Sequence, residues 1–307
     1  MPNTFIDFCG VELKNPVIAA SGTFGFGREY DEYYDISRLG GISCKGLTLE
    51  PRTGNPPPRI AETASGILNS VGLQNPGADH FIAHDLPWLK EKFNQKNTAI
   101  IVNIAGREES DYRALASMLS DTPADIIELN ISCPNVRAGC LSFGASPEGA
   151  EAITAAVRKT CKQPLMVKLS PNAASIADIA KAVESAGADA ISLINTITGM
   201  RIDINTRRPI LRNNTGGLSG AAVFPVAVRM VSEVYRAVSI PVCGMGGVTT
   251  GLDAIEMMMA GASCIQVGTA IFADLFAPLK IIDEIENWLD DKNISDINEI
   301  IGSAKLY

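Results

Sequence analysis

Eight short apolar runs alternate with helical patterns along almost the whole chain. The runs lie at 16–21, 41–46, 99–106, 126–132, 164–170, 190–196, 240–247 and 263–270. Most are apolar at consecutive positions, which is typical of parallel strands that are covered on both faces. Helical patterns separate most of the runs, at 146–160, 175–187, 221–238 and 251–262. Because eight strands with crossover helices favour a closed barrel over an open sheet, we predict an α/β fold, a (β/α)8 TIM barrel.

The same alternation predicts the domain organisation. No linker or low-complexity tract divides the 307 residues, and 46% of them are hydrophobic, which is enough for one large core. We therefore expect a single domain over 1–307. A small N-terminal segment is expected to cap the barrel. Insertions are expected at its C-terminal face, and the long stretch 47–97 is interpreted as one of them.

Local signals predict where two of the helices begin and end. Ser146 precedes a helical pattern whose first residue is Pro147, so we expect Ser146 to be the N-cap of that helix. The pattern at 175–187 ends at Gly187, which we expect to terminate the helix as its C-cap.

Charge and cysteine content exclude several classes of protein. The formal net charge is −8 and the pI about 4.9, whereas binding to nucleic-acid phosphates needs clustered Lys and Arg. No apolar stretch reaches transmembrane length, and the N-terminus shows no pattern of a secretory signal. The 7 cysteines are scattered without a CxxC pair. We expect a cytoplasmic protein with reduced thiols that binds neither nucleic acid nor a membrane.

Polar residues gather where the predicted strands end. They are Ser21, Lys45, Asn103, Asn130, Lys168, Asn195 and Thr196. In a TIM barrel the C-terminal ends of the strands meet at one face, and that face carries the active site. One lysine at a strand end is usually an ordinary edge residue, but two lysines and several asparagines at corresponding ends indicate a site.

Two glycine-rich turns follow the seventh and eighth strands, at 244–251 and 267–270. Such turns can present backbone N–H groups and a helix N-terminus to a phosphate, and TIM barrels often bind phosphate there. The acidic residue that a dinucleotide fold places about 20 residues further on is missing. The turns therefore favour a mononucleotide cofactor such as FMN, and the alternative is that they are plain strand–helix connections.

Lys45 and Lys168 gain a role if a flavin is present. A positive charge near flavin N1 stabilises the anionic reduced ring. The alternative for each lysine is a structural ion pair.

Cys133 follows the end of the fourth strand, beside a strand-breaking proline. An ordinary cysteine has a pKa of roughly 8.5, so it can act as a general base if its site lowers that value. The alternative is a packed thiol, which we favour for Cys44, Cys243 and Cys264. The loop after Cys133 is polar and contains glycine, so it could close over a ligand, and Cys140 within it is interpreted as an incidental thiol.

The two histidines, His80 and His84, have the i, i+4 spacing of metal ligands. No carboxylate lies between them and no further cluster follows, so we predict surface or packing histidines and no metal site.

Nine short motifs match those of a known family, in the same order and over nearly the whole chain. They lie at 19–25, 44–48, 69–77, 130–136, 167–172, 194–196, 216–220, 244–247 and 267–270. Together they resemble class 1 dihydroorotate dehydrogenases. Cysteine at position 133 points to class 1, because class 2 enzymes have serine there. Class 2 enzymes also carry a membrane-associating extension, whereas the first residues here are expected to cap the barrel. The loop after Cys133 is similar to the catalytic FMN subunit of subclass 1B, although Cys140 stands where glycine is expected.

The resemblance implies a role for each matching position. The FMN contacts would be Ser21, Lys45, Gly46, Asn103, Asn130, Lys168, Ile194, Gly220, Gly246, Gly247, Gly268 and Thr269. The dihydroorotate contacts would be Lys45, Asn69, Ser70, Val71, Gly72, Leu73, Asn130, Asn195 and Thr196. Cys133 would be the catalytic base.

The resemblance also implies a reaction and partners. Dihydroorotate would lose a proton from C5 to Cys133 and a hydride from C6 to FMN, giving orotate for pyrimidine biosynthesis. Electrons would pass to NAD⁺ through a partner subunit that carries FAD and a [2Fe–2S] cluster, since this chain has no cysteine spacing for such a cluster. Two copies of the chain would form a homodimer within a heterotetramer with two electron-transfer subunits.

Four alternatives remain open from the residues. The first is a fumarate-dependent subclass 1A enzyme, and the second is a pyrimidine reductase similar to dihydropyrimidine dehydrogenase. The third, a tRNA dihydrouridine synthase, is disfavoured by the acidic charge. The fourth is a non-catalytic barrel that binds phosphorylated ligands.

Overall fold

The computed structural model describes residues 2–132 and 143–307. Cys133, Cys140 and most of the loop expected to close over a ligand therefore lie outside the described residues.

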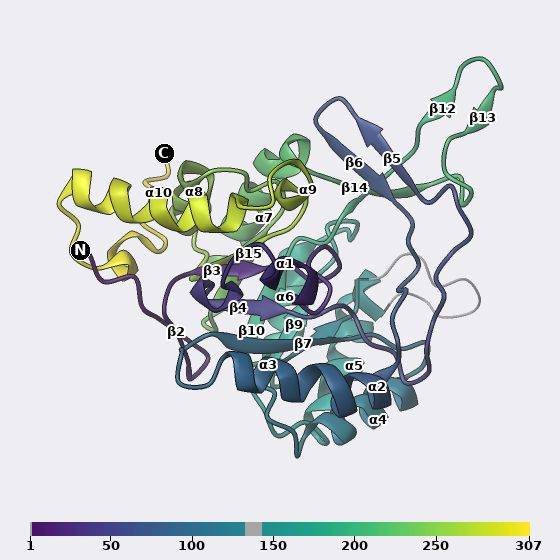
Figure 1. Cartoon of the computed structure of the whole chain (residues 1–307), viewed down its shortest axis with the longest axis horizontal. Coiled ribbons are helices and arrows are strands. Elements are labelled where there is room, and N and C mark those ends of the chain that lie inside the picture. Colours follow the sequence, from purple (N-terminus) through teal and green to yellow (C-terminus); the bar gives the residue numbers. More distant parts are fainter. Residues whose placement is uncertain (1, 133–142) are drawn as a thin grey trace.

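A closed barrel of eight parallel strands forms the centre of the molecule (Figure 1). In ring order its strands are β3 (Val17–Ala19), β4 (Gly41–Ser43), β7 (Ala99–Ile104), β8 (Ile126–Asn130), β9 (Leu165–Lys168), β10 (Ala190–Leu193), β15 (Val242–Met245) and β16 (Cys264–Val267). Each strand lies inside one of the eight predicted runs. The predicted TIM barrel is confirmed, and chain order around the ring is kept throughout.

Helices surround the barrel and bury its outer face. The longer ones are α3 (Leu86–Lys92), α4 (Glu109–Leu119), α5 (Pro147–Arg158), α6 (Ile176–Ser185), α7 (Phe224–Tyr235), α8 (Gly251–Met259) and α10 (Ala277–Lys292). The shorter ones are α1 (Arg28–Asp31), α2 (Ala78–His80) and α9 (Ala270–Ala273), with single turns at Ile36–Arg38, Phe81–Asp85, Phe143–Ala145, Ala221–Val223 and Ile297–Ile300. Within the described residues no helix combines the length and apolarity needed to cross a membrane.

The predicted N-cap Ser146 is confirmed, whereas the C-cap of α6 is Ala186, one residue before the predicted Gly187. The Ser146 hydroxyl accepts a hydrogen bond from the Gly149 N–H at the start of α5, where Pro147 is the first residue. Gly187 follows α6 with φ +94°, a left-handed conformation that residues with a side chain rarely adopt. The four predicted helical patterns contain α5, α6, α7 and α8.

The N-terminal segment forms the small cap that the sequence predicts. Strand β1 (Ile6–Phe8) pairs antiparallel with β2 (Val11–Leu13), and Phe8 and Leu13 are fully buried. The Lys14 N–H donates to the Asn97 carbonyl just before β7, so the hairpin lies at the N-terminal ends of the barrel strands. The opposite end is left for a site.

A separate antiparallel sheet lies beyond the C-terminal ends of the barrel strands (Figure 1). Its order is β11 (Ile197–Gly199), β14 (Gly216–Ser219), β6 (Gly66–Asn69) and β5 (Ile60–Thr63). The hairpin β5–β6 comes from the predicted insertion 47–97. Strands β11 and β14, with the projecting hairpin β12 (Ile202–Asp203) and β13 (Arg208–Pro209), come from a second insertion after β10 that no sequence pattern predicted.

Candidate active site

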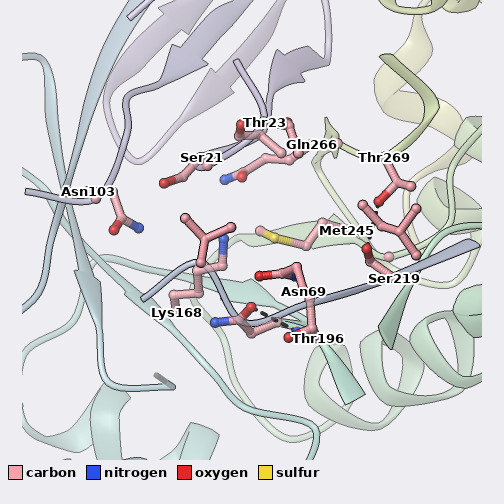
Figure 2. Close-up of a pocket in the computed structure, with 18 of the residues that line it drawn as sticks. Ser21, Thr23, Asn69, Asn103, Lys168, Thr196, Ser219, Met245, Gln266 and Thr269 are labelled. Atoms are coloured by element: carbon pink, nitrogen blue, oxygen red, sulfur yellow. Dashed lines mark hydrogen bonds between the residues drawn. The ribbon is translucent and has the colours of Figure 1, made fainter. Parts of the chain in front are cut away.

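A cavity of about 260 Å³ opens at the C-terminal end of the barrel, beneath the antiparallel sheet (Figure 2). Its volume is close to the roughly 300 Å³ at which ligand and cofactor pockets begin. Residues from the ends of all eight barrel strands line it, together with residues of β5, β6 and β14. This is the face on which TIM barrels carry their active sites.

Most predicted site residues come together in this cavity. Those predicted for the cofactor are Ser21, Lys45, Gly46, Asn103, Asn130, Lys168, Ile194, Gly246, Gly247, Gly268 and Thr269. Those predicted for the substrate alone are Asn69, Val71, Gly72, Leu73, Asn195 and Thr196. Residues far apart in the chain thus surround one space, as the barrel topology requires.

Among the predicted residues that the structure describes, two do not line the cavity. Ser70 is fully buried, and its N–H donates to the Arg59 carbonyl at 2.8 Å. It therefore connects two segments of the insertion 47–97 behind the residues that line the cavity. Gly220 has φ +106°, and a Cβ built there would lie 2.5 Å from the Cα of Gly66. Gly220 thus lies at a close backbone contact with Gly66 of the antiparallel sheet. It is one layer behind Gly247, which lines the cavity.

Several lining residues were missed by the sequence analysis. The polar ones are Thr23, Ser219 and Gln266, and the apolar ones include Met245 and Phe272. The Thr269 hydroxyl donates to Ser219 Oγ at 2.8 Å, which links the last strand–helix turn to β14. Gln266 had a visible signal, because it is a strongly polar side chain within the apolar strand β16.

The two glycine turns offer unused backbone donors. Gly246 and Gly247 have φ values of +121° and +82°, and a Cβ on Gly247 would lie 2.8 Å from the Gly220 carbonyl oxygen. Within the described chain, the N–H groups of Gly246, Gly247, Gly268 and Thr269 donate to no other group. Free N–H groups at adjacent turns form a ready anion site.

Positive charge lies on the floor of the cavity. Lys168, at the end of β9, is 5% exposed, and its side chain makes no hydrogen bond within the part of the chain that the structure describes. Lys45 reaches over the turn after β3, where its Nζ would lie 3.8 Å from a Cβ on Gly22. Two ammonium groups at one cavity favour an anionic or electron-accepting occupant.

Amide side chains are linked to one another on the same floor. The Oδ1 atom of Asn130 accepts a hydrogen bond from Ser132 Oγ at 2.7 Å, and Ser132 Oγ accepts one from Asn195 Nδ2 at 2.6 Å. The Nδ2 atom of Asn130 donates to Asn103 Oδ1 at 3.5 Å. The remaining amide donors and acceptors suit a flat ring that carries both N–H and C=O groups.

A buried carboxylate lies under this floor. Glu128, in the middle of β8, is fully buried, and burial alone would raise its pKa. The nearby Lys168 charge and hydrogen bonds from Asn103, Ser192 and Ser43 outweigh burial and lower the pKa of Glu128. It is therefore ionised at neutral pH.

The two histidines lie on the surface, in and after α2. Both are exposed, their ring centroids are 4.6 Å apart, and His80 Nε2 lies 3.9 Å from Asp85. The buried Asp85 is paired with Arg28 at 3.0 Å. Among the described residues no group of three His, Cys, Asp or Glu side chains is arranged to hold a metal ion.

Comparison with known proteins identifies close relatives. The family model described as "Dihydroorotate dehydrogenase" matches residues 5–289. A protein of Alkaliphilus oremlandii named dihydroorotate dehydrogenase B (NAD(+)), catalytic subunit, is 54% identical over 300 residues, which cover 98% of each chain. Proteins with the same name from Alkaliphilus metalliredigens and Lachnoclostridium phytofermentans are 54% and 50% identical, over 98% and 99% of this chain and 98% and 100% of theirs.

Proposed function

The chain belongs to the dihydroorotate dehydrogenase family, and from that premise we propose that its cavity binds FMN and oxidises (S)-dihydroorotate to orotate in pyrimidine biosynthesis. The proposal rests on one observation: unused backbone N–H donors, two lysines and a hydrogen-bonded set of amide side chains line the same cavity. A mononucleotide phosphate, an electron-accepting ring and a pyrimidine need these three kinds of group.

The residues fit FMN in particular. The free N–H groups of Gly246, Gly247, Gly268 and Thr269 would hold its phosphate, and the glycines leave room for the phosphate oxygens. Ser21, Gly46, Ile194 and the amide of Asn103 would border the ring, with Lys168 supplying positive charge. When bound, FMN supplies the hydride acceptor that no side chain can provide.

The substrate would lie between the FMN ring and the antiparallel sheet. Asn69, Asn130, Asn195 and Thr196 would pair with the N–H and C=O edges of the pyrimidine ring, and Val71, Gly72 and Leu73 would cover it. Lys45 would attract the substrate carboxylate. This arrangement would hold C6 for hydride loss and exclude water from the ring.

Cys133 is proposed as the base that removes the C5 proton. It lies outside the described residues, and the support comes from its neighbour. Ser132 is 2% exposed and is hydrogen-bonded to both Asn130 and Asn195, so the chain enters position 133 from a fixed point beside the proposed substrate amides. A base must lie within hydrogen-bond reach of the proton that it takes.

We further propose an NAD⁺-linked enzyme with a partner subunit, acting in the cytoplasm. The relatives are named as NAD(+)-type catalytic subunits, which supports the same role here. The partner would carry FAD and a [2Fe–2S] cluster, and two copies of this chain would assemble with two partners.

A substrate comparison tests the proposed activity. The purified flavin-loaded chain is assayed with dihydroorotate and with dihydrouracil, using an artificial electron acceptor. We expect rapid oxidation of dihydroorotate alone, because Lys45 can attract a carboxylate that dihydrouracil lacks. Preference for dihydrouracil would instead support a pyrimidine-base reductase.

A further inference from the structure

Glu128 makes contacts that the proposed reaction does not use. Its carboxylate does not line the cavity, yet it accepts four hydrogen bonds from four barrel strands. Oε2 accepts from Ser43 Oγ at 2.8 Å and Asn103 Nδ2 at 2.5 Å, and Oε1 accepts from Ser192 Oγ at 2.7 Å and Gln266 Nε2 at 3.0 Å. Two of these donors, Asn103 and Gln266, line the cavity. The carboxylate is therefore hydrogen-bonded to two lining residues without lining the cavity itself.

An ionised carboxylate only accepts hydrogen bonds, so it dictates how its partners are turned. Asn103 must point its NH₂ group down to Glu128, which leaves its Oδ1 for the Asn130 NH₂ group. Asn130 then presents its own Oδ1 to Ser132, and Ser132 Oγ in turn accepts from Asn195. Each amide is oriented by the one before it, and the chain of bonds begins at Glu128.

Gln266 shows the same constraint on the other side. Its Nε2 donates to Glu128, while its Oε1 is buried and has no hydrogen-bond partner within the described residues. A buried unpaired amide oxygen is unfavourable. Gln266 keeps this orientation because the reverse one would place its oxygen against the carboxylate.

We propose that Glu128 is a positioning residue that fixes the direction of the Asn103–Asn130–Ser132–Asn195 hydrogen-bond chain and places a negative charge on β8, the strand paired with β9, which carries Lys168. The proposal rests on the proposed function, because it assigns these amides to FMN and the pyrimidine. It assigns no direct contact with either to Glu128. Its consequence is that one acceptor-only group sets which edge of each amide the ligands meet.

Replacing Glu128 by Gln tests the proposal with little change in shape. The new NH₂ group must face either Asn103 or Gln266, both of which present NH₂ groups to it, so one amide must turn or lose its bond. In Glu128→Gln we expect orotate to bind about tenfold more weakly, the effect of one mispaired buried group. We also expect a more positive FMN reduction potential, because a negative charge has been removed beneath the ring.

The exchange variant Glu128→Gln with Gln266→Glu separates positioning from a merely structural role. A carboxylate at position 266 accepts from the new NH₂ group at position 128, so the amide oxygen at position 128 again faces Asn103 and the buried negative charge is kept. We expect orotate affinity and FMN potential to return most of the way to the wild-type values. A matched control is Glu184→Gln, since that carboxylate accepts a 2.7 Å bond from the Ser239 N–H, outside the cavity. It should leave both values unchanged.

The readouts are orotate titration of the FMN absorbance and potentiometry of the flavin-loaded chain. If Glu128→Gln matches the wild type in both, or if the exchange is no better than the single change, the positioning role is overturned. If the single variant does not hold FMN, recovery of FMN by the exchange supports the role and failure of both contradicts it. Failure of the wild type to bind orotate would count against the proposed function instead.

Discussion

The Asn195 amide donates a 2.6 Å hydrogen bond to the Ser132 hydroxyl, which ties the end of β10 to the residue before Cys133. Ser132 also donates to Asn130, at the end of β8, so the two asparagines share one hydroxyl. The backbone that leads to Cys133 is thereby held by two residues proposed to bind the substrate. In the proposed mechanism this hydroxyl would therefore link the substrate amides to the residue before the base.

Cys133→Ala is expected to keep FMN but to lower dihydroorotate oxidation at neutral pH by about 10²–10⁴-fold, as loss of a general base does. Cys133→Ser should recover activity only at high pH, because a hydroxyl is far less acidic than a thiol. Both effects are measured as steady-state rates of dihydroorotate oxidation from neutral to alkaline pH. Cys140→Ala is the control and should be almost silent, whereas normal turnover by Cys133→Ala would show that another group is the base.

Gly247→Ala is expected to reduce FMN binding. Its φ of +82° disfavours a side chain, at a cost of about 1 kcal/mol or more, and the new Cβ would lie 2.8 Å from the Gly220 oxygen and Phe224 Cβ. The turn must move, and the proposed phosphate donors move with it. The measurement is the FMN-to-protein ratio after purification.

Gly187→Ala is the matched control for this strain. Gly187 has φ +94° but lies at the end of α6, away from the cavity. It should lower the thermal midpoint while FMN stays at one per chain. Full FMN occupancy in Gly247→Ala would show that the FMN phosphate does not bind at this turn.

Glu128 is expected to make stability depend on acid pH. Because its pKa is lowered in the folded chain, the unfolded chain binds more protons as the pH falls through this range, so stability rises with pH. The contribution is complete above the ordinary glutamate pKa of 4.5 and is lost as pH falls below it. Denaturant unfolding from acid to neutral pH should show a shallower acid slope for Glu128→Gln than for the wild type. The exposed Glu151→Gln variant should keep the wild-type slope, and equal slopes for all three would show that Glu128 is not a source of acid sensitivity.

The isolated chain is expected to reduce NAD⁺ slowly even when dihydroorotate reduces its flavin. The proposed phosphate site suits a mononucleotide, and the chain lacks the glycine fingerprint of a dinucleotide fold. NADH formation is measured with and without the candidate partner subunit. Rapid NADH formation by the chain alone would contradict the partner requirement, and efficient turnover with fumarate would indicate subclass 1A.

The barrel was predictable because each strand is a local apolar run and because apolar residues recur at helical spacing in the segments between the strands. Strand β14 was not, since Gly216–Ser219 has almost no strand propensity and forms by pairing with β6, which is distant in the chain. The end-of-strand residues Lys45, Asn103 and Lys168 were found because topology brings such ends together. Glu128 was missed, although a lone carboxylate inside an apolar strand is a signal, because its four partners come from four different strands.

Anaerobic titration of the purified chain with dihydroorotate tests the central claim most directly. We expect a yellow protein with one FMN, whose absorbance at the usual flavin band, roughly 450 nm, is bleached as about one orotate forms per flavin. A colourless protein that cannot be loaded with FMN, or a flavin that stays oxidised in excess dihydroorotate, would contradict it.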